Sequence, residues 1–350
     1  MDNIGGAEIV GLTLARELKA DFYTTNIDEE KISKMGFSDI KLKSIGKVPI
    51  NAPFRQQLAL WRFRRLKLKG YDFYIIGGDW AISGAINNKP NLWYVHSPIR
   101  EIWDLKDYVR QNLITSWKRP LFDLWVKYNR YLNKKYVNRV NRIVCNSENT
   151  KRRVKKYLQR DAVVINPPIE TSKYYYKKPG DYWFSVNRLL SHKKVDIQIK
   201  AFQKLPNERL IIVGSYEQSR HFKQYANYVK SIKPKNVEII SWVDFDKLVD
   251  LYANCKGFIA TSKDEDFGMT VCEAMASGKP VIVPNEGGYK ETVINGMTGK
   301  LINNISPNNL IKVIKEIAKN PEKYKNACSK QAKKFDTEVF IKKIKEQIEK

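Results

Sequence analysis

The stretch from residue 258 to residue 291 constrains the fold most, because it predicts a strand, a loop, a helix and a second strand in close succession. Residues 258–260 are apolar and predict the end of a buried strand. A polar, acidic loop follows, and residues 269–277 predict a short helix that ends at Gly278, a residue suited to the left-handed position after a helix. Residues 281–283 predict the second strand. This order is the unit of a parallel α/β sheet, in which ligands bind at the carboxyl ends of the strands.

The loop of this stretch combines an anion site with two carboxylates. Its backbone N–H groups and the start of the helix form a site for an anion. Glu265 and Glu273 flank that site. A carboxylate repels a phosphate, but it accepts two hydrogen bonds well from a vicinal diol. Phosphates with diols beside them are what a sugar nucleotide presents, so the loop predicts a site for such a donor.

The composition indicates a basic chain without metal or disulfide signatures. At 350 residues the chain is long enough for two domains. The formal net charge of +26 favours a polyanionic partner, although a generally lysine-rich composition is the plainer explanation. Four cysteines form no CxxC pair and three histidines complete no zinc spacing, which predicts a reducing cytoplasm and no metal site. No apolar stretch approaches the ~20 residues that cross a bilayer and no secretory signal is visible, so we expect any membrane contact at the surface.

The amino-terminal residues predict a turn and a helix that lack a preceding strand. Gly5 and Gly6 open a helix predicted over residues 8–18, and residues 21–25 predict a strand. A Gly-Gly turn of this kind normally follows a first β-strand. We therefore expect either that this strand is missing or, as we favour, that the true start lies upstream of Met1. The turn itself is equally consistent with a simple helix entry and with a phosphate-facing loop.

A histidine is predicted at a ligand-binding edge of the amino-terminal sheet. Residues 71–79 predict a strand that ends in a Gly turn, and residues 91–98 predict a second strand that Pro98 stops. The second strand delivers His96 to its carboxyl end. A lone histidine is usually structural, but this position favours a functional role.

Two basic segments rich in aromatic residues predict a polyanionic surface partner. Residues 54–69 predict a helix with six bases and no acid, and residues 100–142 predict helices in which eight aromatic residues are interleaved with eleven bases and four acids. Such segments suit single-stranded nucleic acid or an anionic lipid interface. The plainer explanation is that the aromatic side chains are core and the bases line the exterior. The charge excess favours a membrane, and no nucleic-acid motif is present.

A linker separates a second α/β set from the first. Prolines and a glycine interrupt residues 167–180. The loop 189–194 follows Arg188, contains Lys193, and suits a diphosphate, although a solvated basic loop is the plainer explanation. We expect base contacts from loops around residues 214–217 and 242–245. The predicted parts are an amino-terminal Rossmann-like acceptor domain, a linker, a carboxyl-terminal donor domain and a final amphipathic helix: 1–167, 168–180, 181–335 and 336–350.

Taken in chain order, these features closely resemble the family 4 retaining glycosyltransferases. The resemblance covers essentially the whole chain, and the ordered set of motifs is specific although no single match decides it. The matching residues are Gly5-Gly6-Ala7-Glu8, Asn146-Ser147, Asn166-Pro167-Pro168, Arg188 with Lys193, Glu265-x7-Glu273 enclosing Phe267-Gly268, the following Ala274-Met275-Ala276-Ser277-Gly278-Lys279-Pro280, and Gly287-Gly288 with Glu291.

The resemblance implies an α/β protein of the GT-B fold. In this fold two Rossmann-like domains face each other across a cleft, and the last helix returns to the amino-terminal domain. It also implies a metal-independent enzyme without a cofactor, whose donor is a GDP- or UDP-sugar. The sequence departs from the family at the missing first strand, which puts the placement of Gly5 and Gly6 in question, and at Asp266, where many members have Gly.

The same resemblance implies roles for the donor-site residues. Arg188 and Lys193 would hold the donor diphosphate and stabilise the leaving group. Glu273 would accept hydrogen bonds from the ribose hydroxyls, and Glu265 from the sugar hydroxyls next to an oxocarbenium-like transition state. Backbone amides would add to the diphosphate site, and these belong to Phe267, Gly268 and Met269.

Two further roles concern the amino-terminal domain. His96 would approach the sugar near its reactive carbon, and Gly5 and Gly6 would allow close backbone approach to the phosphates. Front-face attack by the acceptor is the mechanism that the family implies.

The function that we expect is transfer of a hexose to a lipid-linked or glycan acceptor. Residues 265–268, together with Tyr94-Val95-His96-Ser97-Pro98-x-Arg100, look like a mannosyltransferase-type branch that builds lipid-linked or surface polysaccharide. We expect a cytoplasmic protein, peripheral at the inner face of the cell membrane. The alternatives are a nucleotide-sugar epimerase on the same fold and, less favoured, a non-enzymatic polyanion-binding protein.

Overall fold

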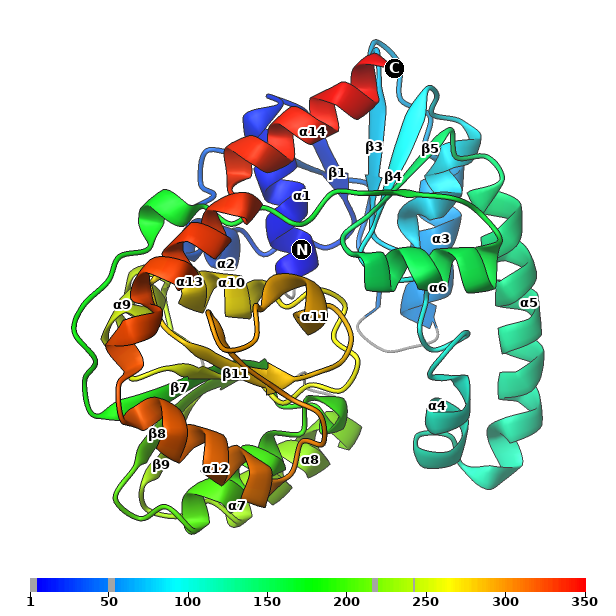
Figure 1. Cartoon of the computed structure of the whole chain (residues 1–350). Helices are drawn as coiled ribbons and strands as arrows, with labels where there is room; N and C mark the ends of the chain where they lie inside the picture. Colours follow the sequence, from blue (N-terminus) through cyan, green and yellow to red (C-terminus); the bar gives the residue numbers. More distant parts are fainter. Residues whose placement is uncertain (1–4, 50–53, 216–219, 242) are drawn as a thin grey trace. The chain divides into compact units, whose positions relative to one another are not determined.

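The protein divides into two compact α/β units. The structure is a computed structural model that describes residues 5–49, 54–215, 220–241 and 243–350 (Figure 1). Unit 1 comprises the chain up to Asn166 together with Phe340–Lys350, and unit 2 comprises Pro167–Val339. Residues 168–180, expected as a linker, pack on unit 2, where the Lys177 amide donates to the Ala253 carbonyl at 3.2 Å.

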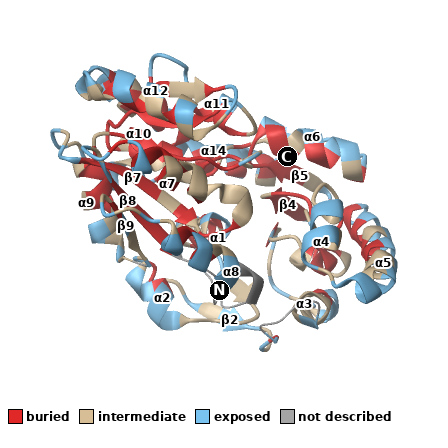
Figure 2. Ribbon diagram, turned by 90° about the horizontal axis from the view of Figure 1, so that it is seen from below, coloured by how far each residue is buried: buried red, intermediate tan, exposed pale blue. Residues whose placement is uncertain are grey.

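Unit 1 contains a four-stranded parallel sheet at its centre. All five residues of its second strand are buried, which explains why this strand is a continuous apolar run rather than an alternating one (Figure 2). The strands pair in chain order: β3 (Tyr74–Gly77), β4 (Asn91–Val95), β5 (Arg142–Cys145) and β6 (Val163–Val164).

A separate pair of parallel strands completes the strands described in unit 1. These strands are β1 (Phe22–Thr24) and β2 (Leu42–Ser44). In the Rossmann order 3-2-1-4-5-6, the first strand joins the two halves of the sheet. Here the two-stranded and the four-stranded sheet are not paired with each other within the described residues, and α1 (Gly6–Glu17) precedes β1.

Unit 1 contains helices in the segments predicted to be helical, but one of these segments is interrupted, and α2 and η1 were not predicted. The segment 54–69 forms α3, but the helical prediction over 100–142 is interrupted, because turns precede α4 and Pro120 starts a new helix in its first turn. The helical elements are α2 (Glu29–Lys34), α3 (Phe54–Arg65), η1 (Ala81–Ile86), α4 (Lys106–Asn112), η2 (Ser116–Lys118), α5 (Arg119–Val137) and α6 (Glu148–Leu158).

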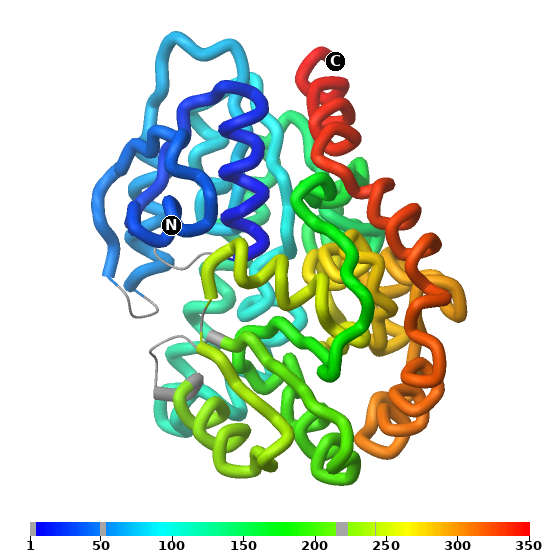
Figure 3. The backbone as a smooth tube through the Cα atoms, turned by 90° about the vertical axis from the view of Figure 1, so that its left-hand side faces the viewer, coloured from blue at the N-terminus to red at the C-terminus, as the bar shows by residue number. Residues whose placement is uncertain are grey.

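The carboxyl-terminal helix α14 (Thr337–Glu349) returns to unit 1, as expected for the fold class. The Phe340 ring packs edge-on against the Tyr94 ring of β4, with 5.7 Å between the ring centroids. The guanidinium of Arg142 on β5 donates to the carbonyls of Gln347 and Ile348, and so satisfies carbonyls in the last turn of the helix. Figure 3 follows this helix to the carboxyl terminus.

Unit 2 is built on a six-stranded parallel sheet in the order β12-β11-β10-β7-β8-β9. Helices α9, α10 and α13 cover one face, and α7, α8 and α12 cover the other (Figure 1). The strands are β7 (Tyr182–Arg188), β8 (Arg209–Ser215), β9 (Val237–Ile240), β10 (Phe258–Ile259), β11 (Val281–Pro284) and β12 (Gly299–Ile302). The helical elements are η3 (Thr171–Lys173), η4 (Ser191–Lys193), α7 (Val195–Gln203), α8 (Arg220–Ser231), α9 (Phe245–Asn254), α10 (Met269–Ala276), α11 (Tyr289–Thr292), α12 (Pro307–Ala318), η5 (Pro321–Tyr324), α13 (Lys325–Ala332) and η6 (Lys333–Phe335).

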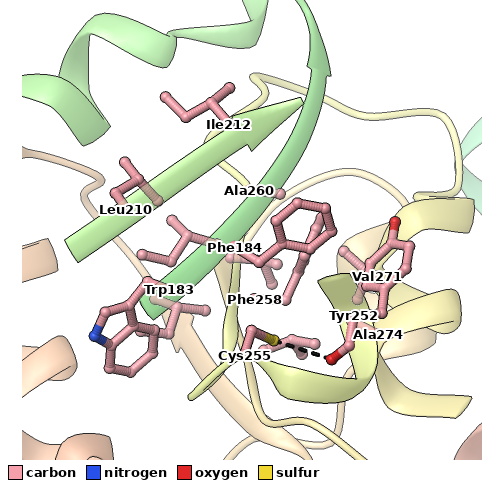
Figure 4. Close-up of a cluster of buried hydrophobic side chains, with 14 of the residues drawn as sticks. Trp183, Phe184, Leu210, Ile212, Tyr252, Cys255, Phe258, Ala260, Val271 and Ala274 are labelled. Atoms are coloured by element: carbon pink, nitrogen blue, oxygen red, sulfur yellow. Dashed lines mark hydrogen bonds between the residues drawn. The ribbon is translucent and has the colours of Figure 1, made fainter. Parts of the chain in front are cut away.

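The core of unit 2 fixes the register of its central strands. Figure 4 shows Phe184 of β7 packed with Phe258 of β10 and Tyr252 of α9. Phe184 is paired with Phe258 across the two strands, and all three side chains are fully buried. This pairing places the loops that follow β7 and β10 next to each other at the carboxyl edge of the sheet.

Candidate functional site

The loops after β7 and β10 meet at the point where the strand order reverses. From β7 the chain continues to β8 on one side of the sheet, and it returns to β10 on the other side. The Lys263 amide donates to the His192 carbonyl at 3.0 Å, and the Thr261 hydroxyl donates to the Lys193 carbonyl at 2.9 Å. Ligands of open α/β sheets bind at such a switch point. The geometry therefore places Arg188, Lys193 and Glu265 at the expected edge of unit 2.

Lys193 and Glu265 form an ion pair at the centre of this site. The Lys193 ammonium donates to Oε2 of Glu265 at 2.7 Å, and the side chains are 19% and 18% exposed. Burial raises the pKa of the Glu265 carboxyl, but the charge and hydrogen bond of Lys193 outweigh burial and bring the pKa to about 2. Glu265 is therefore an ionised acceptor at neutral pH. Lys193 was predicted to contact the diphosphate of the sugar nucleotide, and Glu265 was predicted to contact its sugar. The structure adds that Lys193 and Glu265 contact each other.

The glycine pair at the start of the next helix holds the Glu265 loop in place. Gly287 has φ +60°, and a Cβ at this residue would lie 2.5 Å from the Glu265 carbonyl oxygen. A Cβ on Gly288 would lie 2.5 Å from the Asp266 carbonyl oxygen, and the Gly288 amide donates to the Glu265 carbonyl at 2.8 Å. In the sequence, Gly287 and Gly288 were identified only as a match to the family, without a physical explanation. Their reason is close backbone approach.

Asp266 does not occupy a position that requires glycine. The described non-glycine residues with positive φ are Lys19, Gln159, Lys194 and Asp264, so Asp266 has an ordinary backbone conformation. The backbone therefore tolerates a side chain here.

The start of α10 presents amide groups to the same edge. Gly268 precedes the helix with φ +94°, and the Phe267 ring anchors the loop on the Phe335 ring, with 5.3 Å between centroids. Within the described part of the chain, no acceptor is bonded to the amides of Gly268 and Met269. Such amides, together with the helix dipole, favour an anion.

Tyr252, which was not predicted as a site residue, orients Glu273. The Tyr252 hydroxyl on α9 donates to Oε2 of Glu273 on α10 at 2.7 Å. Burial raises the pKa of the Glu273 carboxyl to about 7, against the lowering effect of this hydrogen bond. Oε1 of Glu273 makes no hydrogen bond within the described residues, which leaves it for a ligand hydroxyl. The Tyr252 ring is fully buried, so nothing in the sequence distinguishes this tyrosine from an ordinary core residue.

Arg188 is the last residue of β7 and is paired with Ser215 of β8. It is partly buried. Its position at the carboxyl end of the central strand matches the predicted place for a diphosphate contact.

His96 lies in unit 1, directly after β4, within a chain of hydrogen bonds. Asn146 Nδ2 donates to the His96 carbonyl at 2.9 Å, and Asn166 Nδ2 donates to the Asn146 carbonyl at 3.1 Å. Burial lowers the pKa of the His96 imidazole to about 4, so the ring is neutral at neutral pH. The two asparagines follow β5 and β6, so three strand ends are tied together around this histidine. In the sequence, Asn146 and Asn166 were identified only as residues that match the family.

Gly5 and Gly6 lie at the start of the described part of the chain. Gly5 caps α1, and its amide donates to the Glu8 carboxylate at 2.9 Å. Residues 1–4, which precede this turn, lie outside the described residues, as do residues 216, 217 and 242 of the loops expected to contact the base. Gly6 begins the helix, so both glycines lie at a helix start as predicted.

Two properties of the described residues bear on cofactors and membranes. No three His, Cys, Asp or Glu side chains in this part of the chain gather in a group that could hold a metal ion. None of its helices combines the length and the apolar character needed to cross a membrane. All four cysteines are free and buried.

Gly287→Ala should destabilise unit 2 more than Gly296→Ala does. Both glycines have positive φ, but a Cβ on Gly296 meets no atom within 4 Å, whereas one on Gly287 meets the Glu265 backbone. We expect Gly287→Ala to lower the free energy of unfolding by about 2 kcal/mol more than the control. Urea unfolding of both variants measures the difference. Equal losses would show that the close approach at Gly287 carries no weight.

Glu273→Gln should flatten the pH dependence of stability. The pKa of Glu273 in the folded protein is about 7, above its ordinary value of 4.5, so its contribution to stability is full below pH 4.5 and is lost as pH rises through 7. Between pH 5 and pH 8 the unfolding free energy of the wild type should fall by about 2 kcal/mol more than that of the variant, in which this group does not titrate. Urea unfolding at both pH values tests this, and parallel pH profiles would contradict it.

Comparison with known proteins assigns both halves of the chain. Residues 4–173 match the sequence model of "Glycosyltransferase Family 4", and residues 171–335 match that of "Glycosyl transferases group 1". An uncharacterized glycosyltransferase of Methanocaldococcus jannaschii is 31% identical over 196 residues, which are 55% of this chain and 54% of the relative. The alpha-1,3/1,6-mannosyltransferase ALG2 of Candida glabrata is 26% identical over 60% of this chain and 53% of its own length. The matches thus span about half the length of these relatives.

Solved structures share the fold of the whole chain. Anabaena HepE in complex with UDP and glucose has a TM-score of 0.77 and 18% identity, and covers 99% of this chain and 96% of its own. A sucrose-phosphate synthase from Thermosynechococcus elongatus has a TM-score of 0.73 and 17% identity, and the match covers 97% of this chain and 90% of the synthase chain. With its two Rossmann-like units, its returning carboxyl-terminal helix and its two adjoining family matches, this chain belongs to the family 4 glycosyltransferases of the GT-B fold.

Proposed function

We propose that this protein transfers a hexose from a nucleoside-diphosphate sugar to an acceptor with retention of anomeric configuration. The observation that carries the proposal is the Lys193–Glu265 pair at the switch point of unit 2, beside the open amides of α10. A cation, an ionised carboxylate and an amide-rich helix start are the groups that a diphosphate with a sugar attached requires. The complexes of Anabaena HepE with UDP and glucose add support, because that protein has the same fold.

The positive charges of the site would replace a metal ion. Arg188 and Lys193 would hold the diphosphate and stabilise the charge that develops on the leaving group, with the α10 amides as further donors. Three features support this chemistry: Arg188 ends β7, Lys193 lies in the loop after β7 in contact with Glu265, and α10 begins after the loop that holds Glu265. The proposal is therefore that the enzyme needs no metal and no cofactor.

The two glutamates would recognise the two ends of the donor. Glu273, held by Tyr252, would accept from the ribose hydroxyls through Oε1, and Glu265 would accept from the sugar hydroxyls. The His96 ring is neutral at neutral pH, so it can offer a hydrogen bond but no positive charge. Retention would follow from front-face attack, with the leaving phosphate accepting the proton.

The proposed sugar is mannose-like and the proposed acceptor is lipid-linked. The motif at residues 265–268 and the ALG2 mannosyltransferases support this choice. A probable sucrose-phosphate synthase of Thermosipho melanesiensis is 31% identical over 41% of this chain, so the family likeness alone does not select the sugar. The basic segments 54–69 and 100–142 support work at an anionic membrane, at its cytoplasmic face.

Lys193→Ala and Glu265→Gln should each abolish sugar transfer while the fold persists. Each variant removes one member of the pair at the proposed reaction centre, and a loss of about 100-fold or more is expected. Lys263→Ala is the matched control, because this exposed lysine lies in the same loop. Radiolabelled GDP-mannose and UDP-glucose, supplied with a bacterial lipid extract, measure the transfer, and circular dichroism checks the fold.

Near-normal transfer by either variant would overturn the site assignment. Incubation with donor alone separates the epimerase alternative, because an epimerase changes the free nucleotide sugar without any acceptor.

A further inference from the structure

A row of large apolar side chains lies exposed along η2 and α5 of unit 1. Their spacing of four and three residues puts them on one face of the helix. We call this row the α5 stripe, and its members with their exposed fractions are Trp117 (71%), Leu121 (64%), Leu124 (65%), Tyr128 (55%) and Tyr131 (62%). Figure 2 shows exposed and buried residues alternating along this helix.

The core of unit 1 does not account for the α5 stripe. The core is contacted by a different set of α5 residues, including Val126, Leu132 and Tyr136, all of which are buried. The helix therefore has a second apolar face that its own unit does not cover. A contiguous row of exposed apolar side chains marks an interaction site more often than single, scattered apolar side chains do.

The charges beside the α5 stripe are positive. Lys118, Lys127, Lys134 and Lys135 are exposed, and two of them lie over stripe rings: Lys118 on Trp117 at 4.8 Å and Lys135 on Tyr131 at 5.9 Å. The one acid of α5, Asp123, is paired with Arg110 at 2.9 Å and with Lys106 at 3.3 Å. The surface around the stripe thus keeps an uncompensated positive charge.

We propose that the α5 stripe inserts into the interface of an anionic lipid bilayer. Tryptophan and tyrosine favour the headgroup region, leucine favours the acyl boundary, and lysines can extend past the aromatic rings to lipid phosphates. A second copy of this chain fits less well, because its lysines would face the lysines of the first copy. The inference rests on the proposed function only for the location of the protein at a membrane. It adds that the α5 stripe is the face that contacts the lipids.

The other basic segment has a different character. On α3 the Arg62 guanidinium donates to the carbonyls of Ile45 and Lys47 at 2.9 Å, and Arg65 stacks on the Trp61 ring at 3.8 Å. Only two of its large apolar side chains, Phe54 and Trp61, are among the exposed ones within the described residues. The α5 stripe is therefore the insertion face, and α3 is not.

Vesicle binding by the full chain tests the inference. Phosphatidylcholine vesicles containing phosphatidylglycerol should co-sediment the wild type, and phosphatidylcholine alone should do so weakly. Leu121→Ser combined with Leu124→Ser should lower the partition coefficient about tenfold or more. Lys127→Glu combined with Lys134→Glu should weaken binding to the anionic vesicles alone. Met297→Ser, at a residue of unit 2 that is 58% exposed, is the control and should bind as the wild type does.

The outcomes separate the stripe from the donor site. Because the substituted leucines and lysines are exposed, the melting temperature and its increase with UDP or GDP should match the wild type. Wild-type binding by the leucine variant would overturn the inference, as would a dimer in solution that this variant dissociates. A chain that binds vesicles through the stripe but no nucleotide sugar would contradict the proposed function and leave the membrane face intact.

Discussion

The ion pair between Lys193 and Glu265 is the interaction on which the site depends. Both side chains are mostly shielded from water, so the loss of either partner without a replacement costs free energy. A diphosphate can replace Glu265 as the partner of Lys193, and sugar hydroxyls can replace Lys193 as donors to Glu265. A nucleotide sugar carries both groups in one molecule. We therefore expect a complete donor to exchange both partners at once, whereas a nucleotide without sugar leaves Glu265 under-satisfied.

The rest of unit 2 serves to hold this pair at the sheet edge. Phe184 and Phe258 set the register of β7 and β10, and the two loops that follow are joined by a backbone hydrogen bond and by the Thr261 hydroxyl. Gly287 and Gly288 press directly on the Glu265 loop from the other side, because neither has a Cβ. Tyr252 holds the second carboxylate, that of Glu273, through a hydrogen bond. Each of these contacts restricts a loop that otherwise has no regular structure.

Local patterns in the sequence predicted local structure well. The strand, loop, helix and strand of residues 258–283 are confirmed, and Gly278 has φ +67° directly after α10. Contacts over long sequence separations were not predictable. Lys193 and Glu265 are 72 residues apart and Tyr252 and Glu273 are 21 apart, so their meeting depends on strand order and register. The stripe on α5 appeared in the sequence as one basic, aromatic segment, because periodicity does not tell which of two apolar faces the core covers.

Calorimetric titration of the full chain with GDP-mannose, UDP-glucose and the matching free nucleotides tests the central claim most directly. The exchange of partners predicts that one nucleotide sugar binds at a single site in the presence of a chelator, and about tenfold or more tightly than its nucleoside diphosphate. Equal affinities for the sugar nucleotide and the free nucleotide, or binding only with a divalent cation, would contradict it.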